Sequence, residues 1–278
     1  MFHDLDVPVD SEDMHMLKDR LNVLEQQGYR VVAVSTSVVA SAGTELPPCP
    51  PIDRIRALCT QSSSSSSSTP PPPLSSSSSA AAAAPSSSSP EPSGITLLAR
   101  LNVVIPDRDS TEVNHAQALV SRASNPSSGY HVVAALPMTE RALRHCCAAL
   151  DVDIITMDLG HRSCPKIRPQ DVILALRRGL RFELPYHSVF QGSLARRNFF
   201  LNGRLLAHAA RKHGLILSSG AHRSMDIRAP LDIINLATLL GLPPGTAKAG
   251  LTKECQQCLD VCVRKRTKTY REAIRLID

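Results

Sequence analysis

The sequence contains no tryptophan, four tyrosines and five phenylalanines, so aromatic side chains make up 3% of its 278 residues. Proteins that read single-stranded RNA usually stack its bases on exposed aromatic rings. This composition therefore argues against base stacking as the main mode of nucleic-acid recognition. Recognition of a phosphate backbone or of a folded shape fits it better, because that requires basic side chains rather than rings.

The motifs of several common enzyme classes are also missing. No glycine-rich phosphate loop follows the first apolar segment, and there is neither a GxxxxGK[ST] loop nor a GxSxG nucleophile elbow. His145 with Cys146, and His161 with Cys164, lack the surroundings that a Cys/His nucleophile pair needs, so we interpret them as structural. No apolar run approaches the roughly 18 residues of a membrane span, and we expect no membrane partner.

The eight cysteines show no paired framework, and the amino-terminal stretch MFHDLDVPVD is acidic where a signal peptide is basic. We therefore expect reduced thiols in an intracellular protein. Cys255, Cys258 and Cys262 have a spacing that occurs in zinc sites, but they also fall at i, i+3 and i+7 of an expected helix. We interpret them as one apolar stripe, with zinc binding as the minor alternative.

A formal net charge of +6 is concentrated near the carboxyl terminus, in VRKRTKTYREAIR at residues 263–275. A solvated helix face and a polyanion-binding surface explain such a run about equally well. Its six basic residues, against Glu272 alone, are Arg264, Lys265, Arg266, Lys268, Arg271 and Arg275.

Serine and proline supply 24 of the 33 residues at 62–94, which predicts a disordered insert. The rest of the chain is close to the size of one (β/α) barrel, about 250 residues. We therefore expect a single domain in which residues 1–61 and 95–263 form the barrel and residues 264–278 form a basic helix or tail.

Short β-rich segments alternate with amphipathic helical stretches along the chain, which is typical of a parallel α/β fold. We expect strands at 2–7, 29–38, 95–105, 130–137, 153–159, 180–186 and 215–220, and helices at 11–28, 113–123, 139–150, 168–179, 195–214 and 229–241. Several strands are apolar on both faces, as a sheet covered by helices requires. An open sheet and a barrel both satisfy this, and the missing glycine-rich loop favours a TIM-barrel-like fold of about seven strands.

Alternation along the expected strands places four charged side chains on faces that would turn into the barrel. A metal or acid/base site is one interpretation, and an internal ion network that holds the strands together is the one we favour. The second strand ends in STS at residues 35–37, which supplies poor metal ligands. The four residues are Asp4, Asp6, Arg100 and Glu183.

The stretch SSGAHRSMDIRAP, residues 218–230, is expected to link a strand to a helix that begins at Pro230. Such loops lie on the carboxyl-terminal face of a barrel, where function concentrates. Arg228 stands just before the helix amino terminus, which attracts anions, and His222 and Arg223 lie in the same loop. We predict a phosphate cradle; the alternative is that Arg228 pairs with Asp226 or caps a neighbouring helix.

Five segments of the sequence resemble those of a known protein family. The longest, residues 182–242, reads FELPYHSVFQGSLARRNFFLNGRLLAHAARKHGLILSSGAHRSMDIRAPLDIINLATLLGL. DLD at 4–6, LLARLNVVI at 97–105, DVDII at 151–155 and AKAGLTKEC at 247–255 accompany it. Together they resemble the family of the thirty-kilodalton protein subunit of eukaryotic and archaeal ribonuclease P, which eukaryotes share with RNase MRP. The resemblance covers nearly the whole chain outside the insert.

The resemblance implies a barrel like that of the polymerase and histidinol phosphatase (PHP) superfamily, in a subunit whose complex cleaves with its RNA. Metal-binding relatives carry an HxH pair on the first strand, where this chain has Asp4 and Asp6. Ser35 and Thr36 stand where family members commonly have a histidine. We therefore expect no cofactor, no resident metal and no catalysis by the chain alone, with Asp4, Asp6 and Glu183 as an internal polar cluster.

The resemblance also implies RNA contacts, or support of the surface that makes them, for a set of arginines. Together with His222 of the loop and part of the carboxyl-terminal basic run, the predicted RNA-binding residues are Arg100, Arg122, Arg196, Arg197, His222, Arg223, Arg228, Arg264, Lys265 and Arg266.

The expected function is that of an RNA-binding subunit of ribonuclease P and RNase MRP. It would assist RNA-catalysed removal of 5′ leaders from precursor tRNA, with rRNA processing as a secondary expectation. Expected partners are the RNase P and RNase MRP RNAs, precursor tRNA indirectly, and other protein subunits including a small RRM-like one, in the nucleus and nucleolus. The alternatives are a metal-dependent phosphoesterase using Asp4, Asp6, Glu183 and His222, and a protein-interaction module whose basic tail serves nuclear import.

Overall fold

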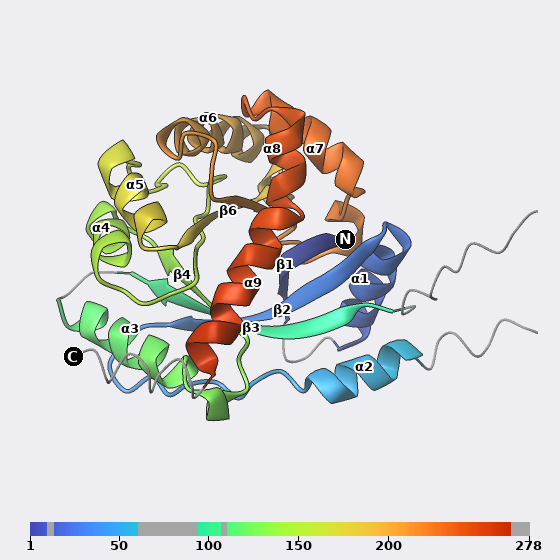
Figure 1. The fold of residues 1–278 in the computed structure, drawn as a ribbon, viewed down its shortest axis with the longest axis horizontal. Coiled ribbons are helices and arrows are strands. Elements are labelled where there is room, and N and C mark those ends of the chain that lie inside the picture. Colours follow the sequence, from blue (N-terminus) through green and yellow to red (C-terminus); the bar gives the residue numbers. More distant parts are fainter. Residues whose placement is uncertain (10–13, 61–93, 107–109, 268–278) are drawn as a thin grey trace, which may run out of the picture.

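The computed structural model describes residues 1–9, 14–60, 94–106 and 110–267, and the predicted insert up to residue 93 and the tail from residue 268 lie outside them. Within the described residues, seven parallel strands follow one another in chain order around a barrel (Figure 1). They are β1 (Phe2–Pro8), β2 (Tyr29–Val39), β3 (Thr96–Ile105), β4 (Val132–Pro137), β5 (Ile154–Ile155), β6 (Arg181–Pro185) and β7 (Leu215–Ser218).

Helices alternate with these strands and surround them (Figure 1). They are α1 (Met14–Gln26), α2 (Ile52–Thr60), α3 (Ser110–Ala123), α4 (Glu140–Ala148), α5 (Pro169–Arg177), α6 (Ser193–Ala209), α7 (Pro230–Leu239), α8 (Pro244–Gly250) and α9 (Lys253–Arg266). Short 3-10 turns are η1 (Pro126–Ser128), η2 (Tyr186–Phe190) and η3 (Ser224–Asp226). In the described part of the chain, no helix is long and apolar enough to cross a lipid bilayer.

The predicted α/β, TIM-barrel-like architecture with seven strands is confirmed. Two expectations need correction: β5 is only Ile154–Ile155 instead of a seven-residue strand, and α2 and α8 were not anticipated. The predicted boundary between residues 263 and 264 falls inside α9, because the helix continues to Arg266.

The ladder in the described residues leaves β1 and β7 as its edges, and hydrogen bonds outside the ladder complete the ring beside β1. At one end, the His3 N–H of β1 donates at 2.9 Å to the carbonyl of Leu251, which lies between α8 and α9. At the other end, the Gly220 N–H donates to the Asp6 carbonyl at 2.9 Å. The barrel is therefore nearly closed, with a seam between its first and last strands.

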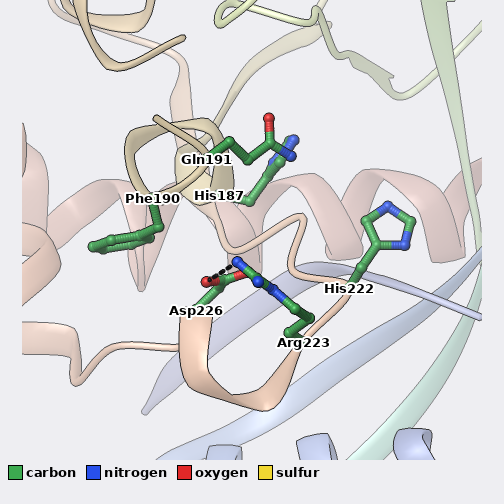
Figure 2. Close-up of a pocket in the computed structure, with 6 residues that line it drawn as sticks. All are labelled: His187, Phe190, Gln191, His222, Arg223 and Asp226. Atoms are coloured by element: carbon green, nitrogen blue, oxygen red, sulfur yellow. Dashed lines mark hydrogen bonds and ion pairs between the residues drawn. The ribbon is translucent and has the colours of Figure 1, made fainter. Parts of the chain in front are cut away.

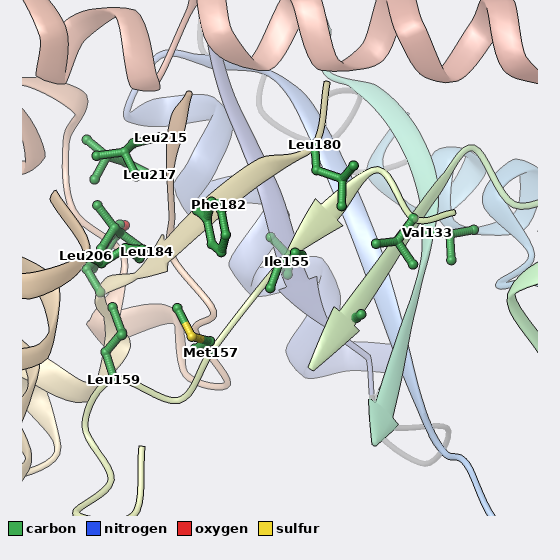
Figure 3. Packing of buried hydrophobic residues seen from close by; sticks show 14 of the residues in the cluster. Val133, Ile155, Met157, Leu159, Leu180, Phe182, Leu184, Leu206, Leu215 and Leu217 are labelled. Carbon is green, nitrogen blue, oxygen red and sulfur yellow. The ribbon is translucent and has the colours of Figure 1, made fainter. Parts of the chain in front are cut away.

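Alternate residues of the strands face two different cores. The outward residues pack against the helices, as Figure 3 shows for Val133, Ile155, Phe182, Leu184, Leu215 and Leu217. The inward residues form a smaller cluster with α9: Leu5, Ala33, Val132, Ala134, Ile154, Ile216, Cys255, Cys258 and Cys262. All three cysteines are buried, so their predicted role as a packing stripe is confirmed.

Helix α9 crosses the barrel at the amino ends of its strands and closes that end (Figure 1). Its last turn is tied to the residues before β5 by ion pairs. Lys265 Nζ lies 2.9 Å from a carboxylate oxygen of Asp151, and Arg266 lies 2.8 Å from one of Asp153. The positive charges of Lys265 and Arg266, two residues of the basic run, are thus compensated by carboxylates of the barrel.

The predicted internal ion network is present at the centre of the barrel. The guanidinium of Arg100 is fully buried and contacts the two carboxylate oxygens of Glu183 at 2.7 and 2.6 Å. It also donates to the Leu5 carbonyl at 2.6 Å and to the Asn102 side chain at 2.7 Å. Burial acts to lower the pKa of Arg100, but the carboxylates of Asp6 and Glu183 outweigh it and raise that pKa, so the guanidinium stays charged.

Asp6 joins this network, whereas Asp4 does not. Asp6 Oδ1 accepts from the Asn102 amide at 3.2 Å and lies 3.9 Å from Arg100 Nε. Asp4 instead faces the seam, where its Oδ1 accepts from the Ser219 N–H at 3.0 Å. The register of β1 shifts between Asp4 and Val7, which breaks the strict alternation that predicted a common face for Asp4 and Asp6.

Asp4 is almost completely buried, and its Oδ2 has no hydrogen-bond partner within the described residues. Burial raises the pKa of this carboxyl from 3.8 to about 7. Hydrogen bonds from Ser219 and Asp6 oppose the shift without cancelling it. Folding therefore favours the protonated form of Asp4.

Replacing Glu183 with Leu is expected to lower the free energy of unfolding by about 3–5 kcal/mol, because it leaves the buried Arg100 without a countercharge. Urea unfolding of the full chain measures this. The double variant Arg100→Met, Glu183→Leu removes both charges and should recover most of the loss. An unfolding midpoint of Glu183→Leu equal to that of the parent would contradict the importance of the pair.

Asp4→Asn is expected to change how stability depends on pH. A carboxyl whose pKa rises from 3.8 to about 7 on folding contributes stability below pH 3.8 and loses it as the pH rises through 7. The asparagine keeps an accepting oxygen but does not titrate. Between about pH 5 and about pH 8, the parent should therefore lose stability relative to Asp4→Asn, on the order of a few kcal/mol. Parallel unfolding free energies across this range would refute the assignment.

Candidate nucleic-acid interface

A cavity of about 430 Å³ lies at the carboxyl ends of β6 and β7, the face of a barrel where binding residues usually gather. Its lining comes from two segments, η2 after β6 and the loop after β7 (Figure 2). The residues are His187, Phe190, Gln191, His222, Arg223 and Asp226, and we call this cavity the mouth pocket.

The loop after β7 is held by a close approach of backbone to side chain. Gly220 has a φ of +56°, and a Cβ added there would lie 2.6 Å from His187 Nδ1. Only glycine combines this backbone conformation with that contact. The next residue, Ala221, accepts a hydrogen bond at 3.0 Å from the buried Arg20 of α1. The predicted helix start at Pro230 is confirmed, so the loop is fixed at both ends.

Asp226 pairs with Arg223, and so the alternative in which it pairs with Arg228 is wrong. The Arg223 guanidinium makes two contacts of 3.1 Å with the buried Asp226 carboxylate (Figure 2). The Arg223 side chain remains 55% exposed, so the pair orients the guanidinium without removing it from solvent. One edge of this cation stays available to an anion.

Arg228 is exposed, and its guanidinium carbon lies 4.6 Å from the centroid of the Phe190 ring. This is a cation–π contact, which orients the cation while its N–H groups remain free to donate. The main chain of Arg228 is fixed by two buried tyrosines. Its N–H donates to the Tyr186 hydroxyl at 3.3 Å, and its carbonyl accepts from the Tyr29 hydroxyl at 3.1 Å. Burial raises the pKa of both phenols, so they stay protonated.

His187 was not anticipated from the sequence, although it lies directly after β6, at the same barrel face as the predicted loop. Its Nδ1 is buried without a hydrogen-bond partner in the described residues. Burial lowers the pKa of this imidazole, and nearby carboxylates only partly offset the effect. His187 is therefore a neutral polar group that lines the pocket together with the exposed His222 (Figure 2).

The other predicted RNA-binding residues do not all join this surface. Arg196 and Arg197 are exposed in the first turns of α6, and Arg196 Nε donates to the Val189 carbonyl of η2 at 2.9 Å. Arg122 lies in the last turn of α3 and Arg264 in the last turn of α9, both exposed and remote in the fold from η2 and η3.

Three of the predicted RNA-binding residues are buried or already paired with carboxylates. Arg100 is 0% exposed inside the barrel, so its prediction as an RNA contact is wrong: the charge serves the internal network. Lys265 and Arg266 are partly buried and already paired with Asp151 and Asp153.

The residues of the phosphoesterase alternative do not assemble. Both oxygens of Glu183 are engaged by Arg100, Asp4 faces Ser219, and His222 lies on the surface. In the part of the chain that the structure describes, no group of three or more His, Cys, Asp or Glu side chains is arranged to hold a metal ion.

Several curated relatives carry ribonuclease P names. The chain is 31% identical over 162 residues to ribonuclease P protein subunit p30 of Mus musculus, covering 58% of each protein. It is 29% identical over 151 residues to ribonuclease P/MRP protein subunit RPP1 of Saccharomyces cerevisiae, covering 54% of this chain and 48% of that one. A relative from Arabidopsis thaliana, Protein GAMETOPHYTE DEFECTIVE 1, is 31% identical over 59% of this chain but only 28% of its own length. These alignments thus span between about a quarter and three fifths of the relatives.

Solved structures share the fold at low identity. A chain of archaeal ribonuclease P with mature tRNA superimposes with a TM-score of 0.60 at 12% identity, covering 93% of this chain and 90% of that one. Aspergillus niger ochratoxinase gives a TM-score of 0.53 at 9% identity over 93% of this chain and 71% of the other. Such likeness concerns the barrel alone.

The barrel, α9 and both segments that line the mouth pocket all lie within one family match. Residues 1–267 match the family described as RNase P subunit p30, and the chain belongs to that family.

Proposed function

We propose that this chain is an RNA-binding subunit of ribonuclease P and RNase MRP that supports removal of 5′ leaders from precursor tRNA without catalysing the cleavage itself. The observation that carries the proposal is the family match over residues 1–267. The name of the mouse relative supports ribonuclease P, and the name of the yeast relative supports both complexes. The proposal includes the RNAs of both complexes, other protein subunits such as a small RRM-like one, a role in rRNA processing through RNase MRP, and a nuclear and nucleolar location.

The mouth pocket is the surface that we assign to RNA. Its lining includes Arg223 and His222, and Arg228 of the same loop lies at its edge over the lining residue Phe190. Arg196, at the start of α6, contacts the adjacent η2. The only carboxylate that lines the pocket, Asp226, is buried and paired. Guanidinium groups held by a ring or a carboxylate lose little freedom when they bind a phosphate.

Recognition at this pocket is of the backbone and not of base identity. Phe190, the one phenyl ring that lines the pocket, has Arg228 over its face, so that face is not open to a stacked base. Phosphate recognition by Lys and Arg releases counterions and therefore depends strongly on salt. Arg122 and Arg264 are left as a separate, weaker contribution from another part of the surface.

Arg228→Ala is expected to weaken binding of the full chain to the RNase P RNA of its own source several-fold. The slope of log K against log salt should fall by about one, as expected when one phosphate contact is lost. The free energy of unfolding should fall by only about 0.5–1 kcal/mol, because a cation–π contact is removed at an exposed site. Lys248→Ala, at an exposed position of α8, is the matched control and should leave both the affinity and the salt slope unchanged. Unchanged RNA binding by Arg228→Ala, or a collapse of its stability, would count against the assignment.

The absence of catalysis by the chain alone is testable directly. Metal analysis of the purified full chain, and a phosphoesterase assay with p-nitrophenyl phosphate in Mn²⁺ or Zn²⁺, should give neither stoichiometric metal nor turnover, because Glu183 is engaged by Arg100. Turnover that disappears in His222→Ala would establish the phosphoesterase alternative instead.

A further inference from the structure

The exposed leucines of the described residues are confined to three consecutive helices. They are Leu174 of α5, Leu194, Leu201 and Leu205 of α6, and Leu231 and Leu239 of α7. Single exposed apolar residues are ordinary, but several gathered on adjacent helices indicate an interaction surface. Helix α6 carries three of the six and lies at the periphery of the barrel (Figure 1).

The three leucines of α6 form one stripe. Leu194, Leu201 and Leu205 are 65%, 55% and 61% exposed, and their spacing of seven and four residues places them on the same helix face. The stripe extends about 16 Å along the axis, because the helix rises about 1.5 Å per residue. The opposite face of α6 packs into the fold through Phe199, Gly203 and Leu206. Helix α6 therefore has a second apolar face beyond the one that the barrel needs.

The charged side chains that α6 itself carries have a single sign. Arg197 and Arg204 are seven residues apart and both exposed, and they run parallel to the leucines. Neither makes an ion pair within the described residues. The sequence contains no Asp or Glu between Glu183 and Asp226, so α6 has no acidic side chain of its own. We call Leu194, Leu201, Leu205, Arg197 and Arg204 together the α6 stripe.

We propose that the α6 stripe is a docking surface for an acidic, amphipathic helix of another protein chain. An apolar seam flanked by charges is the pattern by which helices pair, with opposite charges beside the seam. The leucines would gain nothing from a phosphate backbone, which argues against RNA as the occupant. A second copy of this chain would place arginines opposite arginines, which argues against self-association.

The docking surface is separate from the mouth pocket, although both use the start of α6. Arg196 points to η2, as its hydrogen bond to the Val189 carbonyl shows, whereas Arg197 lies beside the leucines. The proposal therefore moves Arg197 from the predicted RNA contacts to a protein contact. It rests on the proposed function only in taking the partner from the same assembly.

A photo-crosslinking residue in place of Leu205 tests the occupant directly. The full chain carrying p-benzoylphenylalanine is assembled in cells of its source, isolated by an affinity tag and irradiated, and the attached molecule is identified by mass spectrometry. We expect a peptide of another protein with Asp or Glu residues three or four positions apart. Attachment to RNA, to the same chain, or to nothing overturns the proposal. The same residue at Gln117, exposed on α3, is the control and should not capture that peptide.

Two double variants then separate the contribution of the leucines of the α6 stripe from that of its arginines. Leu201→Ser, Leu205→Ser and Arg197→Glu, Arg204→Glu should each reduce the amount of the cross-linked partner in the isolated assembly about tenfold. Their melting temperatures should stay near that of the parent, because the side chains are exposed. Lys248→Glu, Lys253→Glu changes the net charge equally at exposed positions and should retain the partner. Full retention by both α6 variants contradicts the proposal.

Failure of this proposal and failure of the proposed function give different results. If the leucine variant retains RNase P RNA and loses the protein, both proposals stand. If the acidic partner is captured in an assembly without RNase P RNA, the docking surface stands and the proposed function fails. If Arg197→Glu, Arg204→Glu loses RNA directly while the protein is retained, α6 is an RNA surface and the docking proposal fails.

Discussion

A buried guanidinium, that of Arg100, determines how the barrel is arranged around its centre. A charge with no access to water must receive all of its compensation from the protein, and here it comes from three strands at once. Glu183 of β6 and the Leu5 carbonyl of β1 bind Arg100 of β3 from different sides. These contacts hold three strands of the ring at a fixed separation. They also fill the space and occupy the carboxylate that a metal ion would require.

The seam between β1 and β7 connects this interior to the binding face. The loop that carries His222 and Arg228 begins where Gly220 donates to the Asp6 carbonyl, and Asp6 belongs to the network of Arg100. Further along, Tyr29 and Tyr186 fix the main chain of Arg228. The exposed cations of the mouth pocket are thus attached to a backbone whose position is set by buried polar contacts, and this preorganises them for a ligand.

Much of the fold was predictable from the sequence, because the strands alternate with helices and are apolar on both faces. The gathering of Arg100 and Glu183 inside the barrel followed from the period of two along β3 and β6. Arg100 was also taken for an RNA contact, because the family resemblance implied that role for a set of arginines without separating the buried one from the exposed ones. The face predicted for Asp4 was wrong because the register of β1 shifts after this residue, which the sequence does not reveal. His187 was missed because a single histidine after a strand has no distinctive spacing, and only the fold brings η2 beside the loop after β7.

The cysteine stripe of α9 has a consequence for how the molecule opens. Cys255 and Cys258 face the barrel interior from the helix that closes its amino end, and they are 0% and 4% exposed. A thiol reagent reaches them only when α9 separates from the strands. The rate at which these two thiols are labelled therefore measures how often α9 separates from the amino ends of the strands. It does so independently of motions at the mouth pocket, on the opposite side of the barrel.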